Sequence, residues 1–112
     1  MPLTDIERAA AERALRAYCA QKLRAEIRPE VEIVYRLEGR FAYIAERRPD
    51  FRDRAQKRDH DVAKFRFDMT RRSWELFWQD RNMRWHRFTD CAPARDIGEL
   101  LPMVDADPIF YG

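Results

Sequence analysis

Five stretches of this chain alternate apolar and polar residues, and this alternation limits the available folds more than any other feature. The stretches cover residues 31–37, 41–46, 63–69, 73–79 and 83–88. Successive side chains of a β-strand point to opposite faces, so a period of two is typical of a strand with one buried face. The pattern predicts five strands, and the short connections between them favour an antiparallel meander.

A helical pattern precedes the strands. Residues 4–27 are rich in strong helix formers, with Thr4 or Asp5 as the residue that caps the start. Pro29 is expected to stop the helix, because proline lacks the backbone N–H that would continue it. The chain is therefore predicted to begin with one long helix.

A shorter helix is predicted near the other end. Asp96 is its expected N-cap, Glu99 completes a capping-box pattern, and Pro102 should kink or divide it. Residues 109–111 are expected to form a final docked strand. The predicted fold is a single α+β domain over residues 1–112: a long N-terminal helix, an antiparallel five-stranded meander and a short C-terminal helix, with the helices on one face.

The connections between the strands differ in character. Gly39 favours a tight turn between the first two strands, since glycine accepts positive φ. Residues 49–61 are highly charged and are expected to form the most mobile connection. The register after residues 80–82 depends on the loop, so either Trp78 or Phe77 is expected opposite Trp85.

Composition excludes several classes of protein. Three glycines are too few for the glycine-rich loops that hold phosphates. No apolar run approaches the roughly 18 residues of a membrane-spanning helix, and no signal-peptide core follows the N-terminus. Two cysteines form neither a disulfide framework nor a metal-binding spacing. A cytoplasmic protein with free thiols and no membrane association is the expectation.

An ordered set of short segments in residues 30–112 resembles a known family. The segments are Glu46-Arg47-Arg48-Pro49, Val62-Ala63-Lys64-Phe65-Arg66-Phe67, Trp74-Glu75-Leu76-Phe77-Trp78, Trp85-His86, Leu100-Leu101 with Val104 and Asp107, and Phe110-Tyr111-Gly112. The family is a group of small bacterial proteins known as domain of unknown function 3024. The resemblance implies a bacterial, cytoplasmic, single-domain protein, and it implies no activity, cofactor or catalytic residue.

The middle of the chain combines positive charge with aromatic rings. Residues 47–72 contain ten arginines and lysines against five aspartates, in a chain whose net charge is only +2. Lys64 and Arg66 point to one side of their strand, and aromatic residues lie on the neighbouring strands. Such a face can bind single-stranded nucleic acid by stacking and charge. The stronger interpretation is an aromatic core with a solvated arginine face.

Other candidate sites have weaker support. Arg47 and Arg48 can clamp a small anionic ligand, or they can form ion pairs at the end of a strand. His60 and His86 lack a serine or cysteine nucleophile beside them, so structural roles are favoured over catalysis. We therefore expect no catalytic residue, no metal site and no cofactor.

The number of aromatic rings favours a role in binding. Three tryptophans and seven phenylalanines exceed the need of one small sheet, so some should be exposed to a homodimer partner or another protein. The prediction is a non-catalytic binding or interaction module, with single-strand nucleic-acid binding as the alternative and a small-anion site or an enzyme third. The candidate binding residues are Arg47, Arg48, Lys64, Arg66, Trp78, Trp85 and His86.

Overall fold

The computed structural model describes residues 3–25 and 31–111. In chain order, the elements are α1 (Asp5–Ala25), β1 (Glu32–Glu38), β2 (Phe41–Pro49), β3 (Lys57–Asp68), β4 (Ser73–Gln79), β5 (Trp85–Arg87), the 3₁₀ turn η1 (Ile97–Glu99), α2 (Leu101–Ala106) and α3 (Pro108–Tyr111). The strands form one five-stranded sheet in the order β1-β2-β3-β4-β5, and each is antiparallel to its neighbours.

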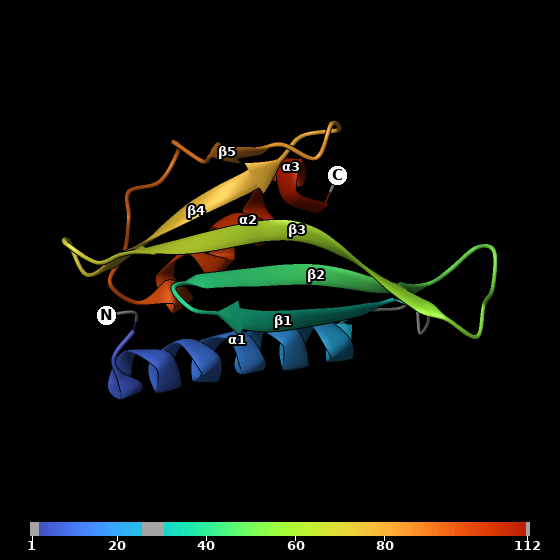
Figure 1. Cartoon of the computed structure of the whole chain (residues 1–112), viewed down its shortest axis with the longest axis horizontal. Helices are drawn as coiled ribbons and strands as arrows, with labels where there is room; N and C mark the ends of the chain where they lie inside the picture. The colour runs from blue at the N-terminus through green and yellow to red at the C-terminus, as the bar shows by residue number, and fades with distance from the viewer. Residues whose placement is uncertain (1–2, 26–30, 112) are drawn as a thin grey trace.

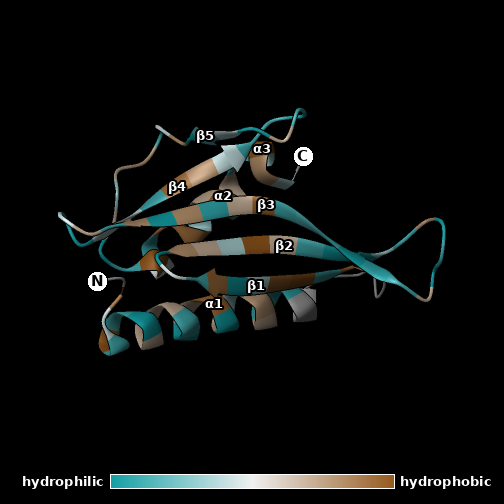
Figure 2. Ribbon diagram, in the orientation of Figure 1, coloured by the Kyte–Doolittle hydropathy of each residue, from teal (hydrophilic) through white to brown (hydrophobic). Residues whose placement is uncertain are grey.

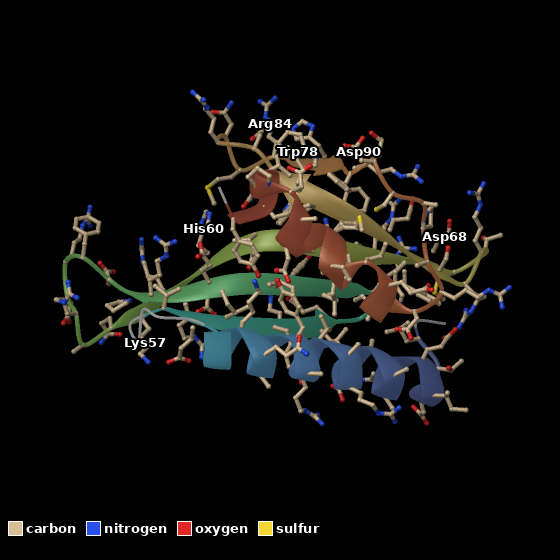
Figure 3. The ribbon with its side chains drawn as sticks, turned by 180° about the vertical axis from the view of Figure 1, so that it is seen from behind. Lys57, His60, Asp68, Trp78, Arg84 and Asp90 are labelled. Carbon is tan, nitrogen blue, oxygen red and sulfur yellow. The ribbon has the colours of Figure 1, made fainter. Side chains whose placement is uncertain are left out.

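The helices lie on one face of this sheet. α1 runs beside β1, and α2 and α3 lie behind the central strands (Figure 1). Seen from behind, α1 and α2 lie in front of the sheet (Figure 3). The predicted α+β class, with an N-terminal helix, an antiparallel meander and a short C-terminal helix, is confirmed. The opposite face of the sheet carries no helix and is called the open face below.

The alternation in the sequence builds the core between the two layers. One side of β3 places Ala63, Phe65 and Phe67 toward the helices, where each is at most 1% exposed. The same face of the neighbouring strands and the inner faces of the helices supply the remaining apolar side chains. They include Ala11, Leu15, Ile44, Trp74, Leu76, Ile97, Leu101, Val104 and Phe110.

The start of α1 is held by a reciprocal cap. The Thr4 backbone N–H donates to Glu7 Oε1 at 2.9 Å, and the Glu7 N–H donates to Thr4 Oγ1 at 3.1 Å. Thr4 is therefore the N-cap, which decides between the two residues that the sequence allowed. Glu7 also binds the Arg72 guanidinium, which attaches α1 to the β3–β4 turn. The predicted end of the helix near residue 27 and its stop at Pro29 lie outside the described residues.

The C-terminal region corrects one prediction. Asp96 caps η1 by accepting from the Gly98 N–H at 2.8 Å, and Pro102 stands at the start of α2, so the predicted helix is divided. The predicted strand over residues 109–111 is wrong, because α3 occupies Pro108–Tyr111. Proline suits the first turn of a helix, and the Asp107 side chain accepts from the Ile109 N–H at 3.0 Å.

The predicted mobile connection over residues 49–61 is also wrong in extent. β3 begins at Lys57 and pairs with the end of β2, so only residues 50–56 join the two strands. The hairpin extends beyond its neighbours (Figure 1), and the strand residues toward its far end are mostly hydrophilic (Figure 2). Strand pairing without a buried face gives no alternation that a sequence could reveal. A register shift between Ile44 and Ala45 marks the point where this exposed extension begins.

The register of the last two strands differs from both alternatives that the sequence left open. β5 is short, and it pairs Gln79 with Trp85 and Trp78 with His86. Neither Trp78 nor Phe77 therefore lies opposite Trp85. The β4–β5 turn sets this offset, since the Asp80 N–H donates to the Arg84 carbonyl at 2.9 Å.

Candidate functional site

A cluster of aromatic rings surrounds Lys64 on the open face. Lys64 lies in the middle of β3, opposite Tyr43 of β2 and Phe77 of β4. Its Nζ lies 4.9 Å from the centroid of the Phe41 ring, and 5.9 Å from the centroids of the Phe77 and Trp85 rings. The Lys64 cluster, meaning Lys64, Phe41, Phe77 and Trp85, thus draws one residue from each of the strands β2 to β5.

The strand pattern explains this gathering. These side chains stand on the face that alternates away from the core, and adjacent strands bring them into cross-strand contact. All of them are partly buried. Tyr43 extends the ring surface, because its ring meets Trp85 edge-on at 6.4 Å between centroids. The result is a sheet face of rings with one ammonium group among them.

Most arginines on the open face have a carboxylate partner. Arg36 lies over the Tyr43 ring at 3.9 Å, and its guanidinium donates to both oxygens of Asp61 at 2.7 and 3.0 Å. The hydrogen bond to Asp61 is the main reason why the pKa of Arg36 is raised. Arg66 donates to Glu75 Oε1 at 2.8 Å, and Arg87 reaches Glu75 Oε2 at 3.2 Å. Each of these arginines therefore has an acidic partner, and Arg66 and Arg87 share the single carboxylate of Glu75.

Lys64 and Arg40 have no acidic partner of this kind. Within residues 3–25 and 31–111, neither has a carboxylate at ion-pair distance, because the acids around them pair with other arginines. Arg40 stands in the β1–β2 turn, with its guanidinium 5.6 Å from the Phe41 ring centroid. The Phe41 ring therefore lies near two cations that have no acidic partner among the described residues. This is the feature of the face that can attract an anion.

A polar cavity borders the same corner of the face. Its volume is about 220 Å³, and it lies where the β1–β2 turn approaches the β3–β4 turn. It is lined by Arg40, Arg66, Asp68, Met69, Thr70 and Glu75. Asp68 is engaged in its own turn, accepting from the Thr70 N–H at 2.9 Å and the Arg71 N–H at 3.1 Å. The pKa of Asp68 is lowered chiefly by its hydrogen bond from the Arg71 N–H.

The residues predicted from the sequence are only partly brought together. Lys64, Arg66 and Trp85 share the open face with the ring cluster. Arg47 is on the same face but at the hairpin end, bound to Asp59 through two hydrogen bonds of 2.8 and 3.1 Å.

Arg48 points to the other side of β2 and binds Glu46 at 2.8 Å. Arg47 and Arg48 therefore do not form one clamp around an anion.

Trp78 and His86 lie on the helix side of the sheet, opposite the face that carries the Lys64 cluster. They pair across β4 and β5, and their rings stack at 4.6 Å with an angle of 26° between the planes. Figure 3, which views the helix side, labels Trp78 at this end of the sheet. His86 Nε2 lies 2.7 Å from Asp80 Oδ2, and this hydrogen bond is the main reason why the pKa of Asp80 is lowered.

The pairing of His86 with Asp80 has a structural role. Asp80 Oδ1 also accepts from the backbone N–H groups of Asn82 and Arg84 at 2.8 and 3.0 Å, so one carboxylate organises the whole β4–β5 turn. The His86 side chain is 45% exposed. A histidine that fixes a turn and stacks on a tryptophan is accounted for without catalysis.

Comparison with known proteins identifies the family. The family model described as Domain of unknown function (DUF3024) matches residues 3–112. The chain belongs to this family. The match confirms the resemblance that the sequence suggested, and it extends over α1, which lies before the segments that carried the resemblance. No curated protein and no solved structure matches the chain.

The site of this DUF3024 domain includes residues that the sequence did not single out. Arg40, Phe41, Tyr43 and Phe77 complete the face around Lys64. The available signal was the position of Phe41 and Phe77 in the polar phase of their strands, where an aromatic ring is unexpected. Their contact with Lys64 required the register between strands, which periodicity alone does not reveal.

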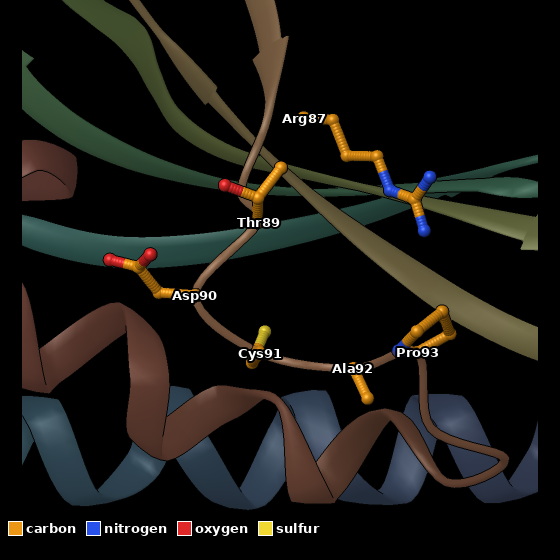
Figure 4. Close-up of a pocket in the computed structure, with 6 residues that line it drawn as sticks. All are labelled: Arg87, Thr89, Asp90, Cys91, Ala92 and Pro93. Carbon is orange, nitrogen blue, oxygen red and sulfur yellow. The ribbon is translucent and has the colours of Figure 1, made fainter.

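A second cavity, beside Cys91, offers less chemistry. It measures about 480 Å³ and is lined by Arg87, Thr89, Asp90, Cys91, Ala92 and Pro93. Arg87 and Asp90 point away from each other across it (Figure 4). Burial is the main reason why the pKa of the Cys91 thiol is raised, and burial raises the pKa of Cys19 to about 11. Neither thiol has the lowered pKa of a reactive cysteine.

Within the described residues, no group of three histidine, cysteine, aspartate or glutamate side chains is arranged to hold a metal ion. No described helix is long and apolar enough to cross a membrane. The open face combines aromatic rings with two cations that have no acidic partner among the described residues, and it is the candidate site.

Proposed function

We propose that this domain is a non-catalytic binding module that takes a planar anionic ligand on the open face of its sheet. The observation that carries the proposal is Lys64, a cation among aromatic rings with no carboxylate partner in the described chain. Flat rings stack on aromatic side chains, and an ammonium group attracts an anion. A ligand that combines the two features fits this surface.

The treatment of charge elsewhere on the face supports a binding role. Arg36, Arg66 and Arg87 each have an acidic partner, as expected for a face that only covers the sheet. Lys64 is partly buried and lacks such a partner, although it costs free energy to desolvate a charge. Contact with the rings offsets about 0.5–2 kcal/mol of this desolvation free energy. A bound anion would offset the rest by its attraction to the ammonium group.

The same count of charges argues against a long polyanion. The excess of positive charge in residues 47–72 is largely bound by neighbouring acids, as for Arg47 with Asp59 and Arg58 with Asp50. Polynucleotide binding through six to ten phosphate contacts requires that many available cations. The face has two that the described carboxylates leave free. We therefore favour a ligand with one anionic group over an extended strand.

The test is a titration followed by NMR, with naphthalene sulfonate as the probe. We expect backbone amide shifts on β2, β3 and β4 around Lys64, and a neutral naphthalene alcohol should bind at least tenfold more weakly. Lys64→Met should lose about tenfold in affinity. Arg16→Met removes the same charge from the exposed surface of α1, on the other side of the sheet, and should change nothing. Equal affinity of Lys64→Met and wild type would refute the proposal.

A homodimer or other protein partner and a cytoplasmic location stay predictions. A homodimer or a protein partner is tested by sedimentation of the purified domain at several concentrations. A cytoplasmic location agrees with two free cysteines, Cys19 and Cys91, which persist best in a reducing compartment.

A further inference from the structure

We propose that the planar anion is a nucleoside monophosphate, whose base stacks on the Lys64 cluster and whose phosphate lies at the Arg40 cavity. This inference rests on the proposed function and goes further by naming the ligand class. It starts from the fact that the rings and the polar cavity are adjacent. Arg40 lines the cavity and also lies 5.6 Å from the Phe41 ring centroid.

Arg66 links the two parts on the other side. It lines the cavity, and its guanidinium lies 5.2 Å from the centroid of the Phe77 ring. A ligand on this face therefore meets rings at one end and guanidinium donors at the other. A nucleoside phosphate has this shape, because a sugar separates its flat base from its charged group. Guanidinium groups match phosphate oxygens with several N–H donors in a fixed plane.

The charge of this corner attracts an anion. Four cations and two carboxylates belong to the Lys64 cluster, the cavity or the ion pairs of Glu75. The cations are Lys64, Arg40, Arg66 and Arg87, and the carboxylates are Asp68 and Glu75. The neighbouring Arg36 is bound by both Glu38 and Asp61, so the corner as a whole keeps one positive unit. A phosphate monoester carries a charge of about −1.5 to −2 at neutral pH, so it is attracted more strongly than a singly charged group.

The carboxylates of the corner do not remove its cations from use. Glu75 already binds both Arg66 and Arg87, and Asp68 accepts two backbone N–H groups of its own turn. The Thr70 hydroxyl is exposed and also lines the cavity, so it can donate to a phosphate oxygen. Arg40 and Thr70 are thus the donors that remain available.

An unpaired nucleic-acid strand also presents bases with exposed flat faces, but its backbone phosphates are diesters that carry one negative charge each. A duplex does not present such faces, because its bases are stacked on each other and their flat faces are covered. The test therefore compares four probes by NMR and calorimetry: adenosine monophosphate, adenosine, inorganic phosphate and a mixed-sequence single-stranded decanucleotide. We expect adenosine monophosphate to bind at least tenfold more tightly than adenosine or phosphate alone.

Two variants assign the phosphate to its end of the site. Arg40→Met should weaken adenosine monophosphate about tenfold and change adenosine less than twofold, whereas Arg16→Met should leave both unchanged. The exposed side chain of Arg40 makes this substitution safe for folding, since only its backbone carbonyl bonds to the sheet, accepting from the Phe67 N–H at 2.8 Å. Binding of adenosine monophosphate should weaken as the ionic strength rises, because mobile ions screen the attraction between its phosphate and Arg40.

Each outcome decides the question. If the decanucleotide binds and adenosine monophosphate displaces it, the ligand chemistry is supported and its source is a strand. Decanucleotide binding that adenosine monophosphate does not displace overturns the inference. The same holds if adenosine binds as tightly as its phosphate, or if Arg40→Met has no effect. If only naphthalene sulfonate binds, this inference fails while the binding module stands, and if no probe binds, both fail.

Discussion

Glu75 is the carboxylate that two arginines of the open face share. Its side chain is 7% exposed and accepts from Arg66 Nε and Nη2 at 3.2 and 2.8 Å, while Arg87 approaches the other oxygen at 3.2 Å. Glu75→Gln keeps the shape of the side chain, but it removes the charge and places an amide N–H₂ near one guanidinium. Two donors then face each other without an acceptor. We predict that this variant is less stable than the wild type.

The size of the loss follows from the geometry. Hydrogen bonds to a charged group contribute about 1.5–3 kcal/mol each when buried. The side chains of Arg66 and Arg87 are 42% and 51% exposed, so water replaces part of each interaction. We expect a loss of about 2 kcal/mol in the free energy of unfolding. With about 2.1 cal/mol/K of unfolding entropy per residue, the melting temperature of the 112-residue chain should fall by about 8 °C.

Urea and thermal unfolding measure this loss. Glu12→Gln is the matched control, because the Glu12 side chain is 37% exposed and lies 3.9 Å from Arg8 on the surface of α1. It should cost less than about 0.5 kcal/mol. Arg66→Gln and the double variant should give a coupling of about 1 kcal/mol. A melting temperature within about 2 °C of the wild type, or zero coupling, would show that Glu75 does not organise the face.

Three further predictions concern the rest of the fold. Tyr18→Phe should cost about 1–2 kcal/mol in urea unfolding, because the Tyr18 hydroxyl donates to Asp105 at 2.8 Å and joins α1 to α2; a neutral result contradicts this tie. Gly39→Ala should cost about 1 kcal/mol, since φ is +60° there and an added Cβ meets no atom within 4 Å; a stability gain would refute backbone strain as the cause. The hydrogen bond from Arg47 is the main reason why the pKa of Asp59 is lowered. The ion pair therefore stabilises the folded state fully above the unfolded pKa of about 3.9, and this stabilisation is lost as the pH falls through the lower pKa of the folded state. The protection factors of the amides at the hairpin end, which correct for the slower intrinsic exchange at low pH, should therefore fall on acidification, and Asp59→Asn should abolish that change.

The parts of the fold that the sequence predicted are those with a buried face. β4 was predicted with its observed bounds, because Trp74 and Leu76 must point into the core. The first part of β3 was missed, since residues 57–60 are exposed on both sides and show no alternation. α3 was mistaken for a strand, because three apolar residues suit either element and the capping by Asp107 was outweighed. A buried face requires apolar residues at alternate positions, which the sequence shows, whereas pairing between exposed strands requires no such pattern.

The candidate site follows the same physical rule. Lys64 and Arg66 could be assigned to one face of a strand, because the period of two fixes which side chains share a side. Whether each cation keeps its charge depends on which acid stands across the next strand, and this is a property of register. In the observed register, Arg66 lies opposite Glu75 and forms an ion pair with it, whereas Lys64 lies against aromatic rings. Much of the positive charge in residues 47–72 is thus paired with acids, whereas Lys64, and Arg40 in the neighbouring turn, have no acidic partner among the described residues. This favours the proposed small planar anion over the single-stranded nucleic acid that the sequence left as the alternative.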